Sequence, residues 1–414
     1  MKDEHAGNGA AGAWQRHRIR HTPTGLQFAL ADSIGFLDAG RWDGIARGQS
    51  LFLDRRYLSL LESLGMDGVA HRYALVYSGN EPVACVAVQL FDWRAESLLD
   101  KAAGDEDADR FRMALRQAQR HALRGFGQRL LVCGNLVSSG LHGVGLASGA
   151  DHSVAWAGIA EALYRIRRGE KLSGESDFLL VKDFKGAGVD AAAALQNYSY
   201  RRVRTEPDMV LTLPPECASF DDYLALLNTK YRGRQKRIRR QIEAAGLVVE
   251  TLDDVRPYDA HIHALYSQVE QRAAVRTAAL PRGYFAALAE CFPEQLRISV
   301  LRDQQRLVGF ISTIRENDGS ALAYYVGMDY GVNAELPVYL RLLQQVVEDA
   351  LALSCHRISF GRTATEPKAN LGAKPVDTWL WARHRLPAVN WFVRQLFPYL
   401  PYEEAPERSP FRER

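Results

Sequence analysis

The chain has little cysteine, and the little that it has is scattered. Its five cysteines form no CxxC pair and show no spacing of a metal site. An odd, dispersed set of this kind is typical of a reducing compartment. These observations exclude a disulfide-stapled miniprotein, and they predict no metal centre. The cysteines are Cys85, Cys133, Cys217, Cys291 and Cys355.

The chain also lacks a large net charge and a long apolar run. Its 52 Lys and Arg residues nearly balance 49 Asp and Glu residues, for a formal charge of +3. We therefore expect no DNA partner, although local basic patches can still matter. The longest uncharged window, Gly134–Ala150, is rich in Gly and Ser, and Met1–Ala13 holds no signal-peptide run. We expect a cytoplasmic protein, with peripheral contact at an anionic inner membrane face as an option.

What is present is typical of a globular protein. The 414 residues are 47% hydrophobic and 24% charged, which excludes global disorder and a collagen-like fibre. This length predicts two domains or three. Pro214-Pro215 can continue neither a helix nor a strand ladder, so we place the junction there. The expected parts are a disordered tail over 1–20, domains over 21–215 and 216–385, and an aromatic, proline-rich tail over 386–414.

The two halves repeat one order of elements. Each reads as strand, helical region, antiparallel strands, helix, strand, short helix and strand, which predicts an α+β tandem duplication. In the first half we expect strands at 26–31, 73–77, 82–91, 129–133, 178–182, 198–204 and 209–213, and helices at 53–64, 95–124, 154–168 and 190–196. In the second half we expect strands at 247–252, 296–302, 307–315, 320–328, 357–360 and 376–384, and helices at 257–274, 281–292, 336–353 and 366–371. A further helix is expected after Ser219, with Phe220, Tyr223, Leu224, Leu227 and Tyr231 on one face.

Four segments carry a resemblance to a known family. They are KYRGRQKR at 230–237, LVCGN at 131–135, YYVGMDY at 324–330 and EPKANLGAKPV at 366–376. Together with the element order they resemble the GNAT superfamily of acyltransferases, in its FemAB/CelD-like branch. The resemblance implies two tandem GNAT-like domains, each a mixed, mostly antiparallel sheet flanked by helices. It also implies acyl transfer to an amine, with acyl-CoA as co-substrate and no permanently bound cofactor.

Members of this group differ in their substrates. They include aminoacyl transferases of the peptidoglycan bridge, exopolysaccharide-related acetyltransferases and bacterial ceramide synthases, which join an acyl-CoA to a long-chain sphingoid amine. This sequence departs from ordinary GNAT enzymes after the strand at 320–328. The pyrophosphate loop R/Q-x-x-G-x-G/A is replaced there by DYGVNA at 329–334. Donor binding by the second half in the usual manner is therefore not implied.

A glycine-rich loop in the first half is a candidate donor site. Gly140, Gly143 and Gly145 have the G-x-x-G-x-G spacing that lets backbone N–H groups approach a pyrophosphate. The alternative is a flexible loop without a ligand. His142 on the same loop is a candidate general base, because imidazole titrates near neutral pH. The alternative is an ordinary surface histidine.

A basic segment follows the domain junction. Residues 230–240 include seven Lys or Arg, and Arg232, Arg234 and Arg237 are candidates for binding phosphates of CoA, tRNA or lipid head groups. The alternative is a solvated helix face with Ile238 and Ile242 turned inward. Arg232 and Arg234 lie on roughly opposite sides of such a helix, so one ligand cannot engage all of the charges.

Acyl transfer needs a base and an acid. Glu366 is a candidate base, since a primary amine attacks only in its neutral form. Tyr325 is a candidate acid for the departing thiolate; because neighbours on a strand alternate, we expect Tyr324 and Tyr325 on opposite faces. Arg362 and Lys368 are candidates for binding phosphate or an oxyanion. The alternatives are aromatic packing for the tyrosine and ion pairs within the segment for the others.

The aromatic C-terminal stretch favours an apolar substrate. Residues 386–402 are too short and too often broken by proline to span a bilayer, but they can lie at an interface, close a substrate tunnel or pack on the second domain. Our first hypothesis is therefore an acyl-CoA-dependent N-acyltransferase with a hydrophobic, sphingoid-like amine acceptor. The second is a Fem-like aminoacyl-tRNA-dependent transferase of the cell envelope, in which tRNA is a partner. The third is a non-catalytic GNAT-like scaffold.

Overall fold

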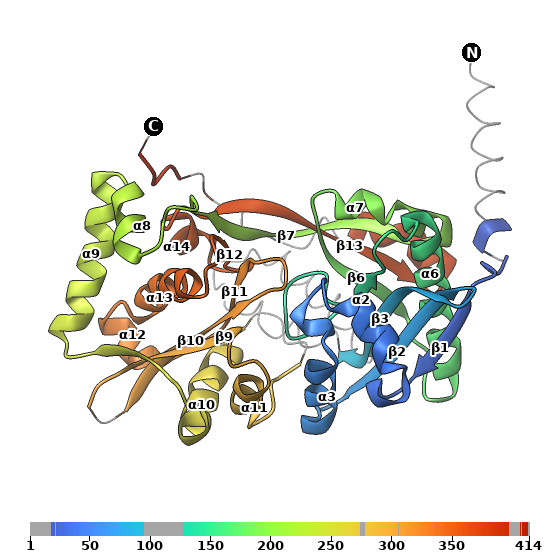
Figure 1. Ribbon diagram of the computed structural model, residues 1–414, viewed down its shortest axis with the longest axis horizontal. Coiled ribbons are helices and arrows are strands. Elements are labelled where there is room, and N and C mark those ends of the chain that lie inside the picture. The colour runs from blue at the N-terminus through green and yellow to red at the C-terminus, as the bar shows by residue number, and fades with distance from the viewer. Residues whose placement is uncertain are drawn as a thin grey trace, which may run out of the picture. The chain divides into compact units, whose positions relative to one another are not determined.

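The structure is a computed structural model that describes residues 18–20, 22–94, 127–273, 278–304, 306–396, 406 and 408–412. The helix expected at 95–124 lies outside these residues. Within the chain two compact units are distinguished (Figure 1). Unit 1 comprises Met1–Glu62, Met66–Thr205 and Thr378–Pro401, and unit 2 comprises Ser63–Gly65, Glu206–Asp377 and Tyr402–Arg414. The chain passes into unit 2 inside one strand, upstream of Pro214, and returns to unit 1 inside another.

Unit 1 is built on a mixed sheet. Its described strands follow the order β1-β2-β3-β4-β6-β13, and β5 pairs with β3. Neighbours are antiparallel except for β4 and β6, which are parallel. The tight turn at Gly79 joins β2 to β3, which contain the strands expected at 73–77 and 82–91. The bounds are β1 Gln27–Ala31, β2 Val69–Ser78, β3 Glu81–Arg94, β4 Gly127–Cys133, β5 Val144–Leu146, β6 Phe178–Lys185 and β13 Lys374–His384.

Helices cover the unit 1 sheet. The longest, α6 (His152–Gly169), begins at Asp151, whose carboxylate accepts hydrogen bonds from two free N–H groups of the first turn. Its apolar face, which includes Trp156 and Leu163, is buried in the core with residues of β2, β3 and β6. The other helices are α2 Ala39–Ala46, α3 Arg55–Leu64, α7 Gly188–Ala191 and α15 Pro387–Leu396. The last of these lies within the segment expected to be a tail.

Unit 2 has a second mixed sheet. Its described strands follow the order β7-β12-β11-β10-β9-β8, and again one pair, β11 with β12, is parallel while the others are antiparallel. The meander expected at 296–328 is confirmed as β9, β10 and β11. The bounds are β7 Arg201–Thr212, β8 Val248–Thr251, β9 Leu296–Arg302, β10 Leu307–Arg315, β11 Ala321–Met328 and β12 Arg357–Ser359.

Two groups of helices cover opposite faces of β9, β10 and β11 (Figure 1). Side chains of successive strand residues alternate between faces. A Cβ on Gly309 would lie 3.0 Å from Leu342 of α13, whereas the ring of the next residue, Phe310, contacts Phe285 of α11. The bounds are α8 Phe220–Leu226, α9 Thr229–Ala244, α10 Asp259–Glu270, α11 Tyr284–Cys291, α12 Tyr330–Glu335, α13 Val338–Ala352 and α14 Thr365–Ala369.

The two units repeat one pattern of strand pairing, which confirms the predicted α+β tandem architecture. Three antiparallel pairs, one parallel pair and one further antiparallel pair follow in the same order in each. One expectation was wrong. The sequence predicts a strand pair at 198–204 and 209–213, but this stretch is the single strand β7 (Arg201–Thr212). Its second half pairs with β12 in unit 2, while β13, late in the chain, pairs with β6 in unit 1.

The glycines of the loop between β4 and β5 are required by close packing. Gly143 lies directly against the backbone after β4, where an added Cβ would be 2.1 Å from the amide nitrogen of Gly134. An added Cβ on Gly145 would be 2.6 Å from Cys85 Sγ. Gly140 has a φ of +142°, and its Cα is covered by the ring of His142. The G-x-x-G-x-G spacing therefore has a structural reason that needs no ligand.

We predict that Gly143→Ala destabilises the protein by about 3 kcal/mol or more, because the neighbour that must move is backbone rather than a flexible side chain. Chemical denaturation measures the free energy of unfolding. Gly233→Ala is the matched control: Gly233 lies inside α9 with no atom within 4 Å of an added Cβ, so alanine should stabilise the protein by up to about 1 kcal/mol. Equal stability of the two variants would contradict the packing argument.

Candidate functional site

The central strand of unit 2 contains a β-bulge. Ile311 of β10 pairs with Val326 of β11, and the next pair is Thr313 with Ala323. One residue of β10, Ser312, thus faces two residues of β11, Tyr324 and Tyr325. The fully buried Ser312 hydroxyl donates to the carbonyl of Tyr325 at 3.1 Å and accepts from its N–H at 2.9 Å. A side chain therefore replaces the ladder partner that the bulge removes.

The bulge corrects the expected orientation of the two tyrosines. The sequence predicts Tyr324 and Tyr325 on opposite faces, but their ring centroids are 4.6 Å apart. Tyr324 donates to or accepts from the hydroxyl of Tyr284 at 2.6 Å, and Tyr325 packs edge-on against Tyr266 and Phe285. The extra residue breaks the alternation, so both rings lie on the face covered by α10 and α11.

The parallel ladder beside the bulge is short. β11 and β12 pair only at Ala321 with Ile358 and at Leu322 with Ser359, just before the bulge. The next residues, Phe360 and Gly361, form backbone hydrogen bonds with β7 and none with β11 among the described residues. Phe360 donates to the carbonyl of Met209, and Gly361 donates to the carboxylate of Asp208 at 3.0 Å. The backbone of β11 after Leu322 is thus released from β12 at the bulge.

Three of the predicted site residues, Arg362, Glu366 and Lys368, follow β12 in one segment. Arg362 comes directly after Gly361, and burial lowers its pKa. Glu366 lies in the first turn of α14, with its side chain 60% exposed and an ion pair to Arg408 at 3.3 Å. Lys368 is 4% exposed, at the other end of the same short helix.

Lys368 holds the turn after β12. Its Nζ donates to the carbonyls of Gly361 and Thr363, and the carboxylates of Asp208 and Glu206 act on its charge. Burial lowers the pKa of Lys368 to about 8, against the opposing effect of these carboxylates. In the same helix, α14, the buried hydroxyl of Thr365 has no hydrogen-bond partner among the described residues. The segment thus contains both a buried amine of lowered pKa and an unsatisfied hydroxyl.

The basic segment forms helix α9, which begins at the Asn228 cap. Ile238 and Ile242 are buried, as predicted, and Gln235 is buried with them. Arg234 and Arg237 are exposed and Arg232 is half-buried. None of these three arginines has an ion pair among the described residues. Lys230, Arg234 and Arg237 follow one another at helical spacing and share one side of the helix.

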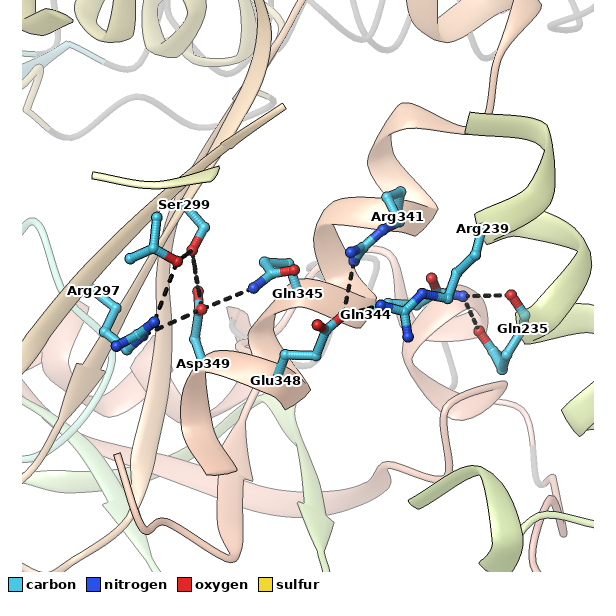
Figure 2. Close-up of polar contacts among 10 residues, drawn as sticks. Gln235, Arg239, Arg297, Ser299, Arg341, Gln344, Gln345, Glu348 and Asp349 are labelled. Atoms are coloured by element: carbon cyan, nitrogen blue, oxygen red, sulfur yellow. Dashed lines mark hydrogen bonds and ion pairs between the residues drawn. The ribbon is translucent and has the colours of Figure 1, made fainter. Parts of the chain in front are cut away.

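A buried polar network fixes α9 against α13 (Figure 2). The Gln344 amide of α13 donates to the side-chain oxygen of Gln235 at 2.7 Å and to its carbonyl at 3.1 Å. Glu348 of α13 pairs with Arg239 and with Arg341, each at 3.1 Å. Arg239 also lies over the ring of Phe220. Arg239 therefore contributes to the packing of α9 on α13, unlike Arg232, Arg234 and Arg237.

A second polar cluster surrounds a buried carboxylate on the side of α13 that faces the sheet (Figure 2). Asp349 is 1% exposed, and burial raises its pKa despite its hydrogen bonds to Ser299 and Gln345 and its ion pair with Arg297. These partners come from β9 and α13. The separate clusters thus tie α13 to the sheet and to α9.

The helix start after β11 is closed to anions. Helix α12 begins at Asp329, whose carboxylate accepts from the N–H groups of Gly331 and Val332 at 2.8 and 3.2 Å. Arg306 pairs with the same carboxylate at 3.1 Å. The free N–H groups that bind a pyrophosphate at a helix start are thus already used, and a negative charge lies there.

The matching part of unit 1 is filled by its own side chains. Lys182 of β6 lies over Gly134 and donates to the carbonyls of Asn135 and Ser138, each at 2.7 Å. His142 is 7% exposed; its Nδ1 lies 2.7 Å from Ser50 Oγ and its Nε2 lies 2.9 Å from the carbonyl of Ser139. Both ring nitrogens are engaged. Roles for His142 and for Gly140, Gly143 and Gly145 in donor binding or catalysis stay predictions.

Arg362, Glu366 and Lys368 thus lie in one short segment after β12, in which Lys368 is buried and Glu366 is exposed, and Tyr325 lies at the bulge of the neighbouring strand β11. Arg232, Arg234 and Arg237 lie on a separate helix of unit 2. Sequence reasoning missed Ser312 and Asp208. Asp208 lies two residues after Glu206 in a stretch with several arginines, so the sequence does not single it out, and nothing in the sequence marks Ser312 as the residue that faces a bulge.

The lowered pKa of Lys368 predicts a pH effect on stability. Below about pH 8 the buried ammonium is charged in both states, and folding bears its full desolvation cost. Between about pH 8 and the ordinary lysine pKa of 10.5 the unfolded chain binds more protons than the folded one, so the contribution of this group to stability rises with pH. We expect the free energy of unfolding of the wild type, minus that of Lys368→Met, to rise over this pH range when both are measured by chemical denaturation at several pH values. Lys374→Met removes an exposed lysine and serves as the control, so its free energy of unfolding should depend on pH as that of the wild type does. If the difference between the wild type and Lys368→Met does not change with pH, the prediction is contradicted.

No group of three metal-ligating side chains occurs in the described ranges. None of the helices that the structure describes combines the length and the apolar run that a membrane crossing requires.

Comparison with solved structures supports the fold. Over 89% of this chain and 100% of the other, the structure is similar to a crystal structure of FemX, with a TM-score of 0.52 and 9% identity. A tandem GNAT protein from the clavulanic acid biosynthesis pathway gives 0.46 and 12% identity over 87% and 99% of the two chains. The lysylphosphatidylglycerol synthetase L-PGS from Bacillus licheniformis gives 0.42 and 11% identity over 82% and 95%. At these identities the first similarity concerns the fold alone.

Among curated proteins, none matches this chain significantly. Residues 229–369 match the acetyltransferase (GNAT) domain family. The match runs from the start of α9 to the end of α14 and so contains the bulge, the parting strands and the Arg362–Lys368 segment. Residues 229–369 of unit 2 are thus similar to a GNAT acetyltransferase domain, and the α+β fold of the chain is GNAT-like with a tandem architecture.

Proposed function

We propose that the protein is an N-acyltransferase, which transfers an acyl group from acyl-CoA to a primary amine. The observation that carries the proposal is the β11 bulge, where backbone is released from the parallel ladder inside the region that matches the GNAT domain family. The neutral amine attacks the thioester carbonyl, the C–N bond forms and the C–S bond breaks. The amine loses a proton to a base, and the thiolate takes one up, so the products are an amide and free CoA.

We place the reaction in unit 2. The strands that part there, β11 and β12, correspond by pairing order to β4 and β6 of unit 1. In unit 1 the Lys182 side chain and the loop that contains His142 cover the end of this parallel pair, and Lys182 and both ring nitrogens of His142 are engaged in hydrogen bonds. Each unit keeps one buried hydroxyl here without a partner among the described residues, Ser138 in unit 1 and Thr365 in unit 2. The covered end of the pair in unit 1, and the match of residues 229–369 to the GNAT domain family, support unit 2 as the half that binds the donor.

Side chains of the bulge and of the segment after β12 are proposed for the remaining roles. Glu366 is the proposed base, and Tyr325 is the proposed acid for the thiolate. Arg362 and Lys368 are proposed to stabilise the negative charge that develops on the carbonyl oxygen. The rings of Tyr266, Tyr284 and Phe285 pack against Tyr324 and Tyr325. Such aromatic surroundings favour an apolar, long-chain amine as the acceptor, of the sphingoid type.

The phosphates of the donor need a site other than the start of α12, because Asp329 closes that helix end. We propose Arg234 and Arg237, which share one side of α9, for this role; Arg232, predicted with them, lies on the other side of the helix. They lack ion pairs among the described residues, and the network beneath them holds the helix in place.

The closed start of α12 and the arginines of α9 also favour a second candidate. This is a Fem-like transferase that takes its acyl group from an aminoacyl-tRNA. A helix start closed by a carboxylate does not suit the pyrophosphate of CoA. A helix whose outer arginines have no ion pair among the described residues suits a polyanion such as tRNA. Peripheral contact with an anionic membrane remains a proposal for either substrate class.

One assay separates the candidates. The purified full-length chain is incubated with long- and short-chain acyl-CoAs and candidate amines, and the release of free thiol is followed. Thiol release that depends on a long-chain amine is the result expected for the first candidate. Turnover of aminoacyl-tRNA alone would replace it by the second. Absence of turnover with either donor, in folded protein, would reject both and favour a scaffold.

We predict that Glu366→Gln lowers kcat by roughly a hundredfold or more, because the amide cannot accept the proton of the amine. Glu294→Gln, an exposed carboxylate of the same unit, is the control and should keep normal turnover. Normal kcat in Glu366→Gln would remove this residue from the role of base. The pH dependence of kcat, measured on both variants, distinguishes a lost base from a general loss of activity.

We predict that Arg234→Gln combined with Arg237→Gln raises the KM for the phosphate-bearing donor roughly tenfold, with little change in kcat, since the lost contacts are remote from the reacting atoms. Arg256→Gln, which removes an exposed arginine paired with Asp254, is the control. If the double variant keeps its KM, the basic face of α9 is only a solvated surface.

A further inference from the structure

We propose that unit 1 contains a binding site for a phosphate group, formed by Arg20, Arg167 and Arg383 with the hydroxyl of Tyr200. The site is independent of the proposed acyl transfer and lies within one unit. It differs from the glycine loop, because its residues come from the last turn of α6, from β13 and from the segments before β1 and β7.

The first argument is uncompensated charge. Arg167 and Arg383 are both half-buried, and neither has a hydrogen bond or an ion pair to its guanidinium among the described residues. Burial lowers the pKa of each, and a neighbouring arginine lowers it further: Arg20 acts on Arg383, and Arg383 acts on Arg167. Like charges gathered in a partly desolvated place are costly unless an anion lies between them.

The nearby carboxylates do not supply that anion. Glu175 is the carboxylate that acts on Arg167, but it already pairs with Arg385 at 2.6 Å and with Lys171 at 3.8 Å. Asp177 is bonded to the same Arg385 at 2.7 Å. The negative end of α6 favours Arg167, which lies in its last turn, but it does not account for Arg383 on β13.

The second argument is an unsatisfied hydroxyl. Tyr200 is fully buried, and its hydroxyl has no partner among the described residues. The charges of Arg383 and Arg167 both act on it, and the Arg383 guanidinium lies 6.0 Å from its ring centroid. A buried donor without a partner costs free energy, and a phosphate oxygen accepts from exactly this kind of group together with guanidinium N–H donors.

Neighbouring bonds hold the cluster in place. Arg20 donates to the hydroxyl of Ser199 at 2.6 Å, and the carbonyl of Ser199 accepts from Asn390 of α15 at 2.9 Å. The ring of Tyr164 lies beneath Arg167, with the guanidinium 6.0 Å from its centroid. The phosphate can belong to a free ion or to a lipid head group, because α15 beside the cluster exposes Trp391 to 61%.

The test begins with inorganic phosphate on the full-length chain. Thermal unfolding and calorimetric titration are recorded at constant ionic strength, with chloride replaced by phosphate. We expect a saturable rise in Tm, because a ligand that binds only the folded state stabilises it. Arg383→Gln and Arg167→Gln should each weaken phosphate binding roughly tenfold or more. Arg165→Gln, an exposed arginine of the same helix paired with Glu161, removes the same charge and should bind normally.

A second arm distinguishes the source of the phosphate. Vesicles of phosphatidylglycerol and of phosphatidylcholine are sedimented with each variant. Binding to phosphatidylglycerol that is lost in Arg383→Gln but kept in Arg165→Gln assigns the site to a lipid head group. A phosphate effect without vesicle binding assigns it to a soluble phosphate. Absence of both effects in the wild type, or equal effects in all variants, would overturn the proposal.

Tyr200→Phe keeps the test decisive should an arginine variant fail to fold. It preserves the ring and every charge and removes only the hydroxyl. We expect the phosphate-free variant to be at least as stable as the wild type, since the unsatisfied group is gone, and phosphate binding to weaken roughly fivefold. Unchanged phosphate binding would exclude the hydroxyl and with it the site as stated.

Discussion

One extra residue in β11 decides much of the chemistry that unit 2 can offer. Because Tyr324 and Tyr325 together face Ser312, the strand loses its regular partners, and the serine hydroxyl takes over both the N–H and the C=O of Tyr325. A buried bulge without such a partner would leave polar backbone unsatisfied, at a cost of a few kcal/mol. With Ser312 in place the backbone can depart from β12, and both tyrosine rings reach the same face.

The two units share one fold but differ in what lies at the end of their parallel strand pair. Both pair their strands in the same order, with a single parallel pair at the same position. In unit 1 the end of that pair is occupied by Lys182, the close-packed glycines and the His142 loop. In unit 2 it is followed by the turn that Lys368 holds, and it carries the bulge. The difference lies in side chains and a few loop residues rather than in architecture, as is usual when function is placed on a common fold.

Charge is distributed unevenly beneath an almost neutral total. In unit 2, Arg239 and the buried Arg341 share the carboxylate of Glu348, whereas Arg232, Arg234 and Arg237 of α9 have no ion pair among the described residues. In unit 1, Arg167 and Arg383 lack an ion pair in the described part of the chain, while Arg385 takes the nearby carboxylates of Glu175 and Asp177. Arginines with carboxylate partners serve packing, and arginines without them mark the places where the protein has positive potential to offer to a ligand.

The sequence by itself determined the element order, the tandem α+β architecture, the meander of unit 2 and the inward side of α9, since each depends on local periodicity. It also grouped Arg362, Glu366 and Lys368, which are neighbours in the chain. Only the tertiary structure decided the bulge, the single strand β7 and its pairing in unit 2, and the burial of His142 and Lys368. These depend on partners distant in sequence: Ser312 for Tyr325, β12 for β7, Ser50 for His142 and Asp208 for the turn at Gly361. Local residue patterns carry no record of which distant strand or side chain will supply a hydrogen bond.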